Sequence, residues 1–194
     1  MRFKKVIATG VVAVFLMISG VAHAQVLPKF GIKGGVNYST FNNTDNVDYK
    51  PGFVGGIYSN INIPATPVSI QPEVLFAQYG ADIEGSDASF NINYIQVPVL
   101  LKFGFGLASV KPNVFFGPYM GFNIKSEVKN NDASINLDDQ AEDTDFGIAV
   151  GAGIDISKFS IGVRYTAGLK NVANSSINSE AKNGAIALSL GVAF

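Results

Sequence analysis

Five charged residues are the strongest candidates for chemistry, because each stands alone in a segment of apolar and small residues. They are Lys33, Glu73, Lys102, Asp155 and Arg164. In each segment the apolar residues alternate with the others, and the charge falls on the less apolar face, which predicts β-strands with inward charges. A lone buried charge is costly, so we expect these five to pair. Such a set serves either as a structural ion network or as a proton or solute relay.

A second candidate is the acidic stretch 126–145. Its carboxylates are of the type that binds Ca²⁺ or bridges lipid phosphates through divalent ions. The stretch lacks the glycine and spacing of an EF-hand loop, so a solvated loop is the alternative interpretation. The predicted ligands are Asp138, Asp139, Glu142, Asp143 and Asp145.

Several activities are disfavoured by composition. The chain has no cysteine, and its single histidine, His23, lies in a segment that we expect to be removed. A Ser-His-Asp triad therefore has no base, although a mechanism that uses only Asp and Glu stays open. No basic patch points to nucleic acid. We expect no enzymatic activity and no cofactor.

The N-terminus resembles a secretory signal. Arg2, Lys4 and Lys5 precede an uncharged apolar run, and Ala22-His23-Ala24 ends in small residues. This pattern predicts that 1–24 is a cleaved signal peptide, with a membrane anchor as the alternative, and that 25–194 is one domain. Cleavage would leave 11 basic residues against 15 acidic ones, a net charge of about −4.

Eight alternating segments must position the inward charges. They span 30–40, 52–63, 68–80, 92–105, 110–124, 146–156, 159–169 and 184–194. Long polar connections at 42–50, 82–90, 126–145 and 170–183 alternate with tight turns at 64–67, 106–109 and 157–158. This rhythm predicts an all-β fold, an eight-stranded antiparallel up-and-down transmembrane β-barrel. A soluble lipocalin-type barrel is the alternative.

The outward faces and the strand ends carry further expectations. Outward phenylalanine and tyrosine residues are expected to form interfacial girdles. The last segment, with Leu190, Val192 and Phe194 on its apolar face, is expected to close the barrel and to be read by the barrel-assembly machinery. Strand prolines Pro72, Pro98 and Pro118 remove ladder donors, so we expect bulges there.

Ordered segments of the chain resemble the PorT-like family of outer-membrane β-barrels. They include GIKGGVNYSTF (31–41), PGFVGGIYSNI (51–61), IQPEVLFAQYGAD (70–82), YIQVPVLLKFGFG (94–106), FFGPYMGFNI (115–124), DFGIAVGAGIDI (145–156) and FSIGVRYTAGLKNV (159–172). The resemblance implies the barrel fold and an outer-membrane location. It implies no active site, since the family contains secretion-associated proteins and many without an assigned activity.

These observations predict a non-enzymatic integral outer-membrane barrel that presents long polar loops at the cell surface, for envelope integrity, secretion or partner binding. Its expected partners are outer-membrane lipid, the barrel-assembly machinery and an unknown protein or surface bound by the loops. The alternative is a narrow porin-like channel or transporter for small solutes. An eight-stranded barrel is only just wide enough for its own side chains, which favours the first hypothesis and a structural role for the inward charges.

Overall fold

In the computed structural model, the segments in which apolar residues alternate with small or polar ones form β-strands. The structure describes residues 27–42, 47–83, 89–106, 109–130, 133–136, 144–171 and 182–194. The strands are β1 (Lys29–Asn42), β2 (Val47–Asn62), β3 (Val68–Ile83), β4 (Ser89–Gly104), β5 (Val110–Asn130), β6 (Ala133–Asn136), β7 (Thr144–Ile156), β8 (Phe159–Asn171) and β9 (Lys182–Ala193). These ranges contain no helix with the length and hydropathy needed to cross a membrane.

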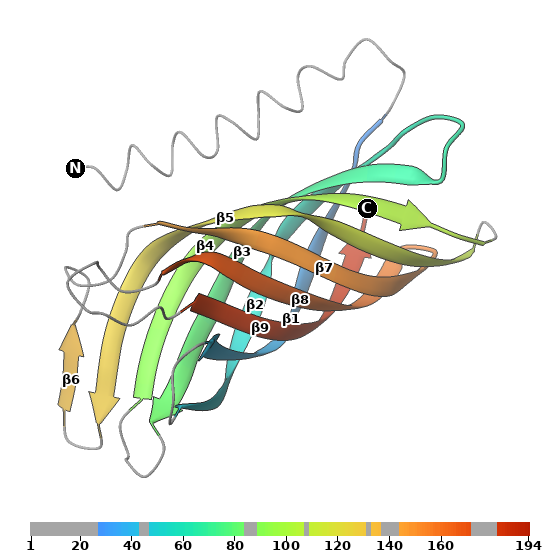
Figure 1. Cartoon of the computed structure of the whole chain (residues 1–194). Helices are drawn as coiled ribbons and strands as arrows, with labels where there is room; N and C mark the ends of the chain where they lie inside the picture. Colours follow the sequence, from blue (N-terminus) through green and yellow to red (C-terminus); the bar gives the residue numbers. More distant parts are fainter. Residues whose placement is uncertain are drawn as a thin grey trace.

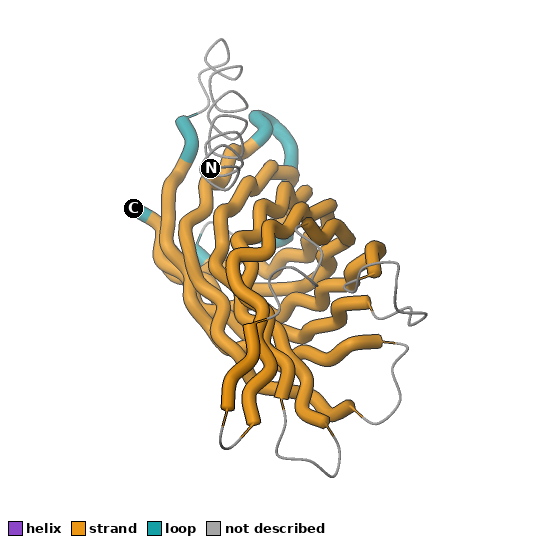
Figure 2. The backbone as a smooth tube through the Cα atoms, turned by 90° about the vertical axis from the view of Figure 1, so that its left-hand side faces the viewer, coloured by secondary structure: helices purple, strands orange, loops and turns teal. Residues whose placement is uncertain are grey.

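The strands form one closed antiparallel wall. Each long strand pairs with its neighbours in chain order, β5 pairs with both β4 and β7, and β9 returns to pair with β1. Figures 1 and 2 show the tilted strands wrapping around a common axis. The short β6 pairs only with β5 and lies outside the closed wall. The prediction of an eight-stranded up-and-down barrel is therefore confirmed.

Closure depends on the register between the first and last strands. Val192 lies opposite Ile32, and Leu190 lies opposite Gly34. The amide of Phe194 donates a hydrogen bond of 2.9 Å to the carbonyl of Phe30. Every backbone group must find a partner inside a bilayer, so this pairing of β9 with β1 removes the last open edge of the sheet.

Apolar and polar residues separate onto the two faces of the wall as the alternation predicts. Along β7, Ile148 and Val150 are both 49% exposed and point outward, whereas Ala149 between them is 1% exposed. Large apolar residues are exposed on the outer face of every long strand except β4, where those on the outer face are half-buried. A contiguous apolar surface of this extent is not stable in water and fits a hydrocarbon environment. The soluble-barrel alternative does not account for it.

The tight turns all lie at one end of the barrel. The amide of Ile63 donates to the carbonyl of Val68 across the β2–β3 turn, where Ala65 has a φ of 61°. Ser157, between β7 and β8, has a φ of 56°. Gly106, after β4, has a φ of 104°, which glycine adopts without the steric cost that a side chain would bring.

The expectation of bulges at the three strand prolines is wrong. Pro72, Pro98 and Pro118 each keep their pairing with the following strand, opposite Val99, Tyr119 and Ile148. On the side of the preceding strand, two residue pairs are missing at each proline. The pairing then continues in the same register, so no residue has been inserted. Since each backbone N–H points to only one neighbour, a proline removes one ladder bond without inserting a residue.

The register instead shifts at other places. One shift lies between Tyr49 and Val54 in β2, and another lies beside Asn93 in β4, opposite Ile124. The extra residue at Ile124 places Lys125 opposite Asn93, on the outward side, and Lys125 is exposed. Strict alternation from Asn123 predicts that Lys125 faces inward, and this prediction is wrong because a one-residue slip reverses the face.

Strands also extend beyond the predicted segments at the other end of the barrel. β5 continues to Asn130 and forms a hairpin with β6, although 126–145 was expected to be a loop. β7 begins at Thr144, so Asp145 belongs to a strand. Outside the hydrocarbon region polar residues suit both faces of a strand, and alternation no longer marks it.

Candidate functional site inside the barrel

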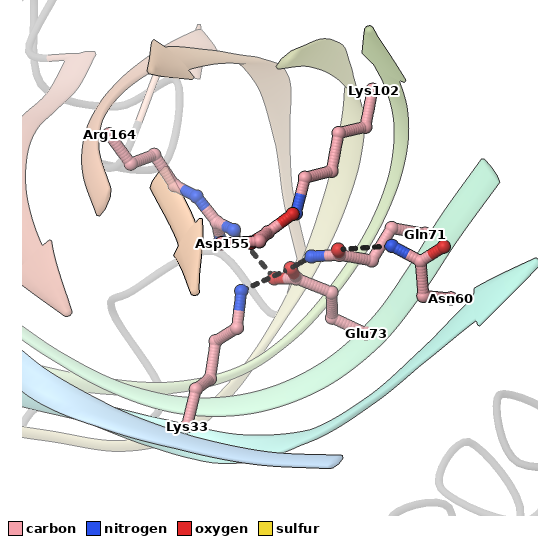
Figure 3. A network of polar contacts seen from close by, with 7 residues as sticks. All are labelled: Lys33, Asn60, Gln71, Glu73, Lys102, Asp155 and Arg164. Atoms are coloured by element: carbon pink, nitrogen blue, oxygen red, sulfur yellow. Dashed lines mark hydrogen bonds and ion pairs between the residues drawn. The ribbon is translucent and has the colours of Figure 1, made fainter. Parts of the chain in front are cut away.

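The central feature of the lumen is the carboxylate of Glu73, whose side chain is fully buried. Its Oε1 lies 2.6 Å from Nζ of Lys33, and its Oε2 lies 2.7 Å from Nη2 of Arg164. Nε2 of Gln71 donates a third hydrogen bond, of 2.7 Å, to Oε1. The two cations come from β1 and β8, so the cluster joins three strands that are far apart in the sequence (Figure 3).

The carboxylate also fixes the orientation of two side-chain amides. An ionised carboxylate only accepts hydrogen bonds, so Gln71 must turn its NH₂ group toward Glu73. Its Oε1 then accepts from Nδ2 of Asn60 at 3.3 Å. The Oδ1 atom of Asn60 is buried and has no hydrogen-bond partner within the described part of the chain. Hydrogen-bond donation in this network therefore runs from Asn60 on β2 through Gln71 to the carboxylate of Glu73 on β3.

Lys102 and Asp155 form a second ion pair beside the first cluster. Nζ of Lys102 lies 2.8 Å from Oδ2 of Asp155, across the lumen between β4 and β7. Asp155 is less buried than Glu73, with 30% of its side chain exposed. Figure 3 shows the pair next to the Glu73 cluster. The structure thus brings together all five inward charges named from the sequence, in one triad and one pair.

Aromatic rings support both cations of the triad, a feature that sequence reasoning missed. In each case the ring lies directly opposite a glycine of the neighbouring strand, and a side chain at that glycine would collide with it. Lys33 lies over the ring of Tyr58, which is opposite Gly31. Arg164 lies over the ring of Phe115, which is opposite Gly151. The cations lie 5.1 and 5.5 Å from the ring centroids, within cation–π range. A glycine opposite an aromatic residue on the neighbouring strand would indicate such a contact, but the sequence alone does not show which residues are opposite each other.

A layer of large side chains fills the lumen nearer the long connections. The rings of Tyr79 and Tyr94 meet edge to face at a centroid distance of 5.7 Å. Nε2 of Gln96 donates to the hydroxyl of Tyr79 at 2.9 Å. Leu75, which lies opposite Gln96, is 1% exposed. A cavity of about 20 Å³ lies between Tyr79 in this layer and Lys33 and Arg164 of the triad, and this is about the volume needed for a single water molecule.

The acidic candidate site is only partly inside the described residues. Asp138, Asp139, Glu142 and Asp143 lie outside them. Asp145, predicted to belong to the loop, is instead buried in β7, where its Oδ2 accepts a hydrogen bond of 3.0 Å from the Tyr119 hydroxyl. Across the described ranges, no three carboxylate, histidine or cysteine side chains gather in a group suited to a metal ion.

The lumen opens into a cavity of about 160 Å³ at the end that carries the tight turns. Its wall includes the inner cations Lys33, Lys102 and Arg164 together with Lys29 and Lys111. The alternation of the strands gives no reason to expect a cavity here. The space exists because inward positions of β7 and β8 are glycines, including Gly153 and Gly162, which lie directly opposite each other.

An apolar outer wall around a filled polar lumen defines an integral membrane β-barrel. Residues 24–174 match the family described as "Outer membrane protein beta-barrel domain", and the chain belongs to this family. It is an outer-membrane β-barrel protein.

Solved structures of other barrels resemble this fold. Neisserial surface protein A (NspA) is 14% identical, with a TM-score of 0.53 over 85% of this chain and 97% of NspA. Ail of Yersinia pestis is 15% identical, with a TM-score of 0.47 over 86% of this chain and 97% of Ail. The N-terminal barrel of Pseudomonas aeruginosa OprF is 10% identical, with a TM-score of 0.41 over 87% and 100%. No curated protein matches the chain. At these identities the likeness concerns the fold.

Proposed function

We propose that this protein is a non-enzymatic barrel whose working parts are its long polar connections, presented at the cell surface to a partner or surface in envelope integrity or secretion. The observation that carries the proposal is the filled lumen. A barrel that does not conduct acts through its ends, and binding residues concentrate on loops held by a rigid scaffold. The ion network then serves to hold the scaffold closed.

Two successive layers oppose a channel function. The Glu73 triad ties β1, β3 and β8 together across the lumen. Above it, the ring of Tyr79 packs against that of Tyr94, and a cavity of only about 20 Å³ lies between Tyr79 and the triad. A solute would have to displace a paired buried charge and then several packed rings. The porin-like alternative therefore requires a rearrangement of the whole interior.

The topology supports surface presentation by one end of the barrel. In an up-and-down barrel the connections β1–β2, β3–β4, β5–β7 and β8–β9 leave from the same end, opposite the tight turns. Thirteen of the 15 acidic residues lie in or beside these connections. Outer-membrane barrels place their longer loops outside the cell. We accordingly assign the polar, acidic end to the outside.

Cysteine labelling on intact cells tests this orientation, because the chain contains no cysteine of its own. Single substitutions Ser86→Cys and Ser176→Cys fall in the connections β3–β4 and β8–β9, and Lys158→Cys falls in the β7–β8 turn. A maleimide that cannot cross membranes is expected to label the first two in intact cells and the third only after permeabilisation. The reverse pattern would overturn the proposal.

Planar-bilayer recording tests the filled lumen separately. The purified barrel is expected to give no discrete unitary currents. Reproducible unitary currents would favour the channel instead. Replacing 137–143 by a Gly/Ser segment of equal length, with the same replacement at 84–88 as the control, then tests which connection a surface partner needs.

Two finer assignments belong to the same proposal. We infer that residues 1–24 are removed on export, which N-terminal sequencing of the purified protein tests. We also infer kinship with PorT-like barrels, which rests on the ordered segments quoted above. That kinship favours a secretion-associated role, and deletion of the gene followed by a survey of secreted proteins tests it.

A further inference from the structure

The cavity at the turn end carries a large excess of positive charge. Six cationic side chains line it: Lys29, Lys33, Lys102, Lys111, Lys158 and Arg164. Two carboxylates offset them, namely Asp155 in the wall and Glu73 behind two of the cations. The excess is four positive charges around about 160 Å³. Charge of one sign in a concave site of low dielectric concentrates ions of the opposite sign.

The cations form two layers. The inner layer consists of Lys33, Lys102 and Arg164, whose side chains are 10–12% exposed and held in place by ion pairs. The outer layer consists of three exposed lysines at the mouth: Lys29, Lys111 and Lys158. Within the described ranges these three make no ion pair. The mouth therefore presents uncompensated charge above an ordered polar floor.

Neutral donors complete the lining. Asn62, Asn113 and Ser160 contribute amide and hydroxyl groups to the same wall. Inner cations keep donors beyond those used in their ion pairs, since an ammonium group has three N–H bonds and a guanidinium has five. Converging cationic and neutral donors suit a compact anion with several oxygen atoms.

We propose that this turn-end cavity binds a phosphate group, either on a small solute or on a phospholipid headgroup. Four excess charges exceed what one carboxylate would neutralise, whereas a phosphate or pyrophosphate offers more charge and more acceptors in a similar space. The cavity is large enough for such a group together with water. The mouth lysines provide most of the attraction, and the inner cations provide the floor.

NMR titration of the full-length barrel in detergent tests the proposal, with inorganic pyrophosphate as the probe and chloride added to hold the ionic strength constant. Saturable shifts are expected at Asn113, Ser160 and Gly162, with one apparent dissociation constant. The variant Lys29→Gln/Lys111→Gln/Lys158→Gln should weaken binding by about tenfold or more, since each charge-assisted hydrogen bond lost weakens binding appreciably. These lysines are exposed, so the variant is expected to fold.

Matched single variants separate the site from general electrostatics. Lys111→Gln and Lys125→Gln remove the same charge from opposite ends of β5. The first should weaken pyrophosphate binding and the second should leave it unchanged. Equal effects from both variants, or shifts that chloride alone reproduces, would overturn the proposal.

Micelles of an alkyl maltoside, which carries no phosphate, distinguish the two sources of phosphate. If the cavity takes a lipid headgroup, the same resonances shift when phosphatidylglycerol is added to these micelles in the absence of pyrophosphate. If it takes a solute, they shift only with pyrophosphate. Either result supports the phosphate site, and the absence of saturable shifts from both probes overturns it.

Discussion

Removal of the Glu73 charge is the most informative perturbation of this barrel. In Glu73→Gln the side chain keeps its shape and one acceptor oxygen, but Lys33 and Arg164 lose their shared counter-charge. Both cations are nearly buried, at 12% and 10% exposure, and both lie within 2.7 Å of the carboxylate. Breaking a buried pair in this way costs about 3–5 kcal/mol. This is a large part of the roughly 5–15 kcal/mol that stabilises a typical domain.

Two comparisons make the result interpretable. Replacing all three groups, with Glu73→Gln, Lys33→Met and Arg164→Met, leaves no unpaired charge, and we expect it to recover most of the loss. Asp155→Asn makes the same acid-to-amide change in the pair whose carboxylate is 30% exposed. We expect it to cost less than Glu73→Gln, because it leaves one nearly buried cation without its counter-charge, Lys102, rather than two.

The assay is urea unfolding in lipid vesicles, followed by far-ultraviolet circular dichroism and by the heat-dependent shift of the folded band on a gel. Tryptophan fluorescence cannot be used, since the chain has no tryptophan. A loss below about 1 kcal/mol for Glu73→Gln would show that water screens the triad and would refute the reasoning. A triple variant no more stable than the single one would show that packing, not charge, is responsible.

Further predictions concern the outer wall and the upper layer. Val150→Arg, midway along β7, should cost about 2–4 kcal/mol in the same unfolding assay, whereas Ile156→Arg at the turn end should cost about 1 kcal/mol or less. Equal costs would contradict the assigned membrane depth. Tyr119→Phe removes the hydroxyl that binds buried Asp145 and should cost about 1.5–3 kcal/mol. Tyr165→Phe, on the outward face, should be nearly neutral, and a comparable loss there would show that the measured effect is not specific to the lumen.

The strands were predictable because lipid and lumen impose opposite demands on alternate residues. Val150 and Ala149 illustrate the contrast within two positions of β7. The prediction failed where that contrast ends. Beyond the hydrocarbon region a polar strand and a polar loop look alike, so the end of β5 and all of β6 were read as loop.

The inward charges could be named from the sequence, but not their partners. Lys33 and Arg164 meet Glu73 only because the closed register sets β1 and β8 across the lumen from β3. Alternation assigns a face and gives no height along the barrel axis. The turn-end cavity could not be predicted either, because it arises where Gly153 and Gly162 lie opposite each other and supply no side chain.

The prolines have a mechanical consequence for the wall. Their missing donors interrupt three adjacent ladders, β2–β3, β3–β4 and β4–β5, whereas β1–β2, β1–β9 and β5–β7 run without a gap. The cylinder is therefore not uniformly stiff around its circumference. Thermal breathing should concentrate on the side formed by β2 to β5, while the seam where the chain ends meet stays rigid.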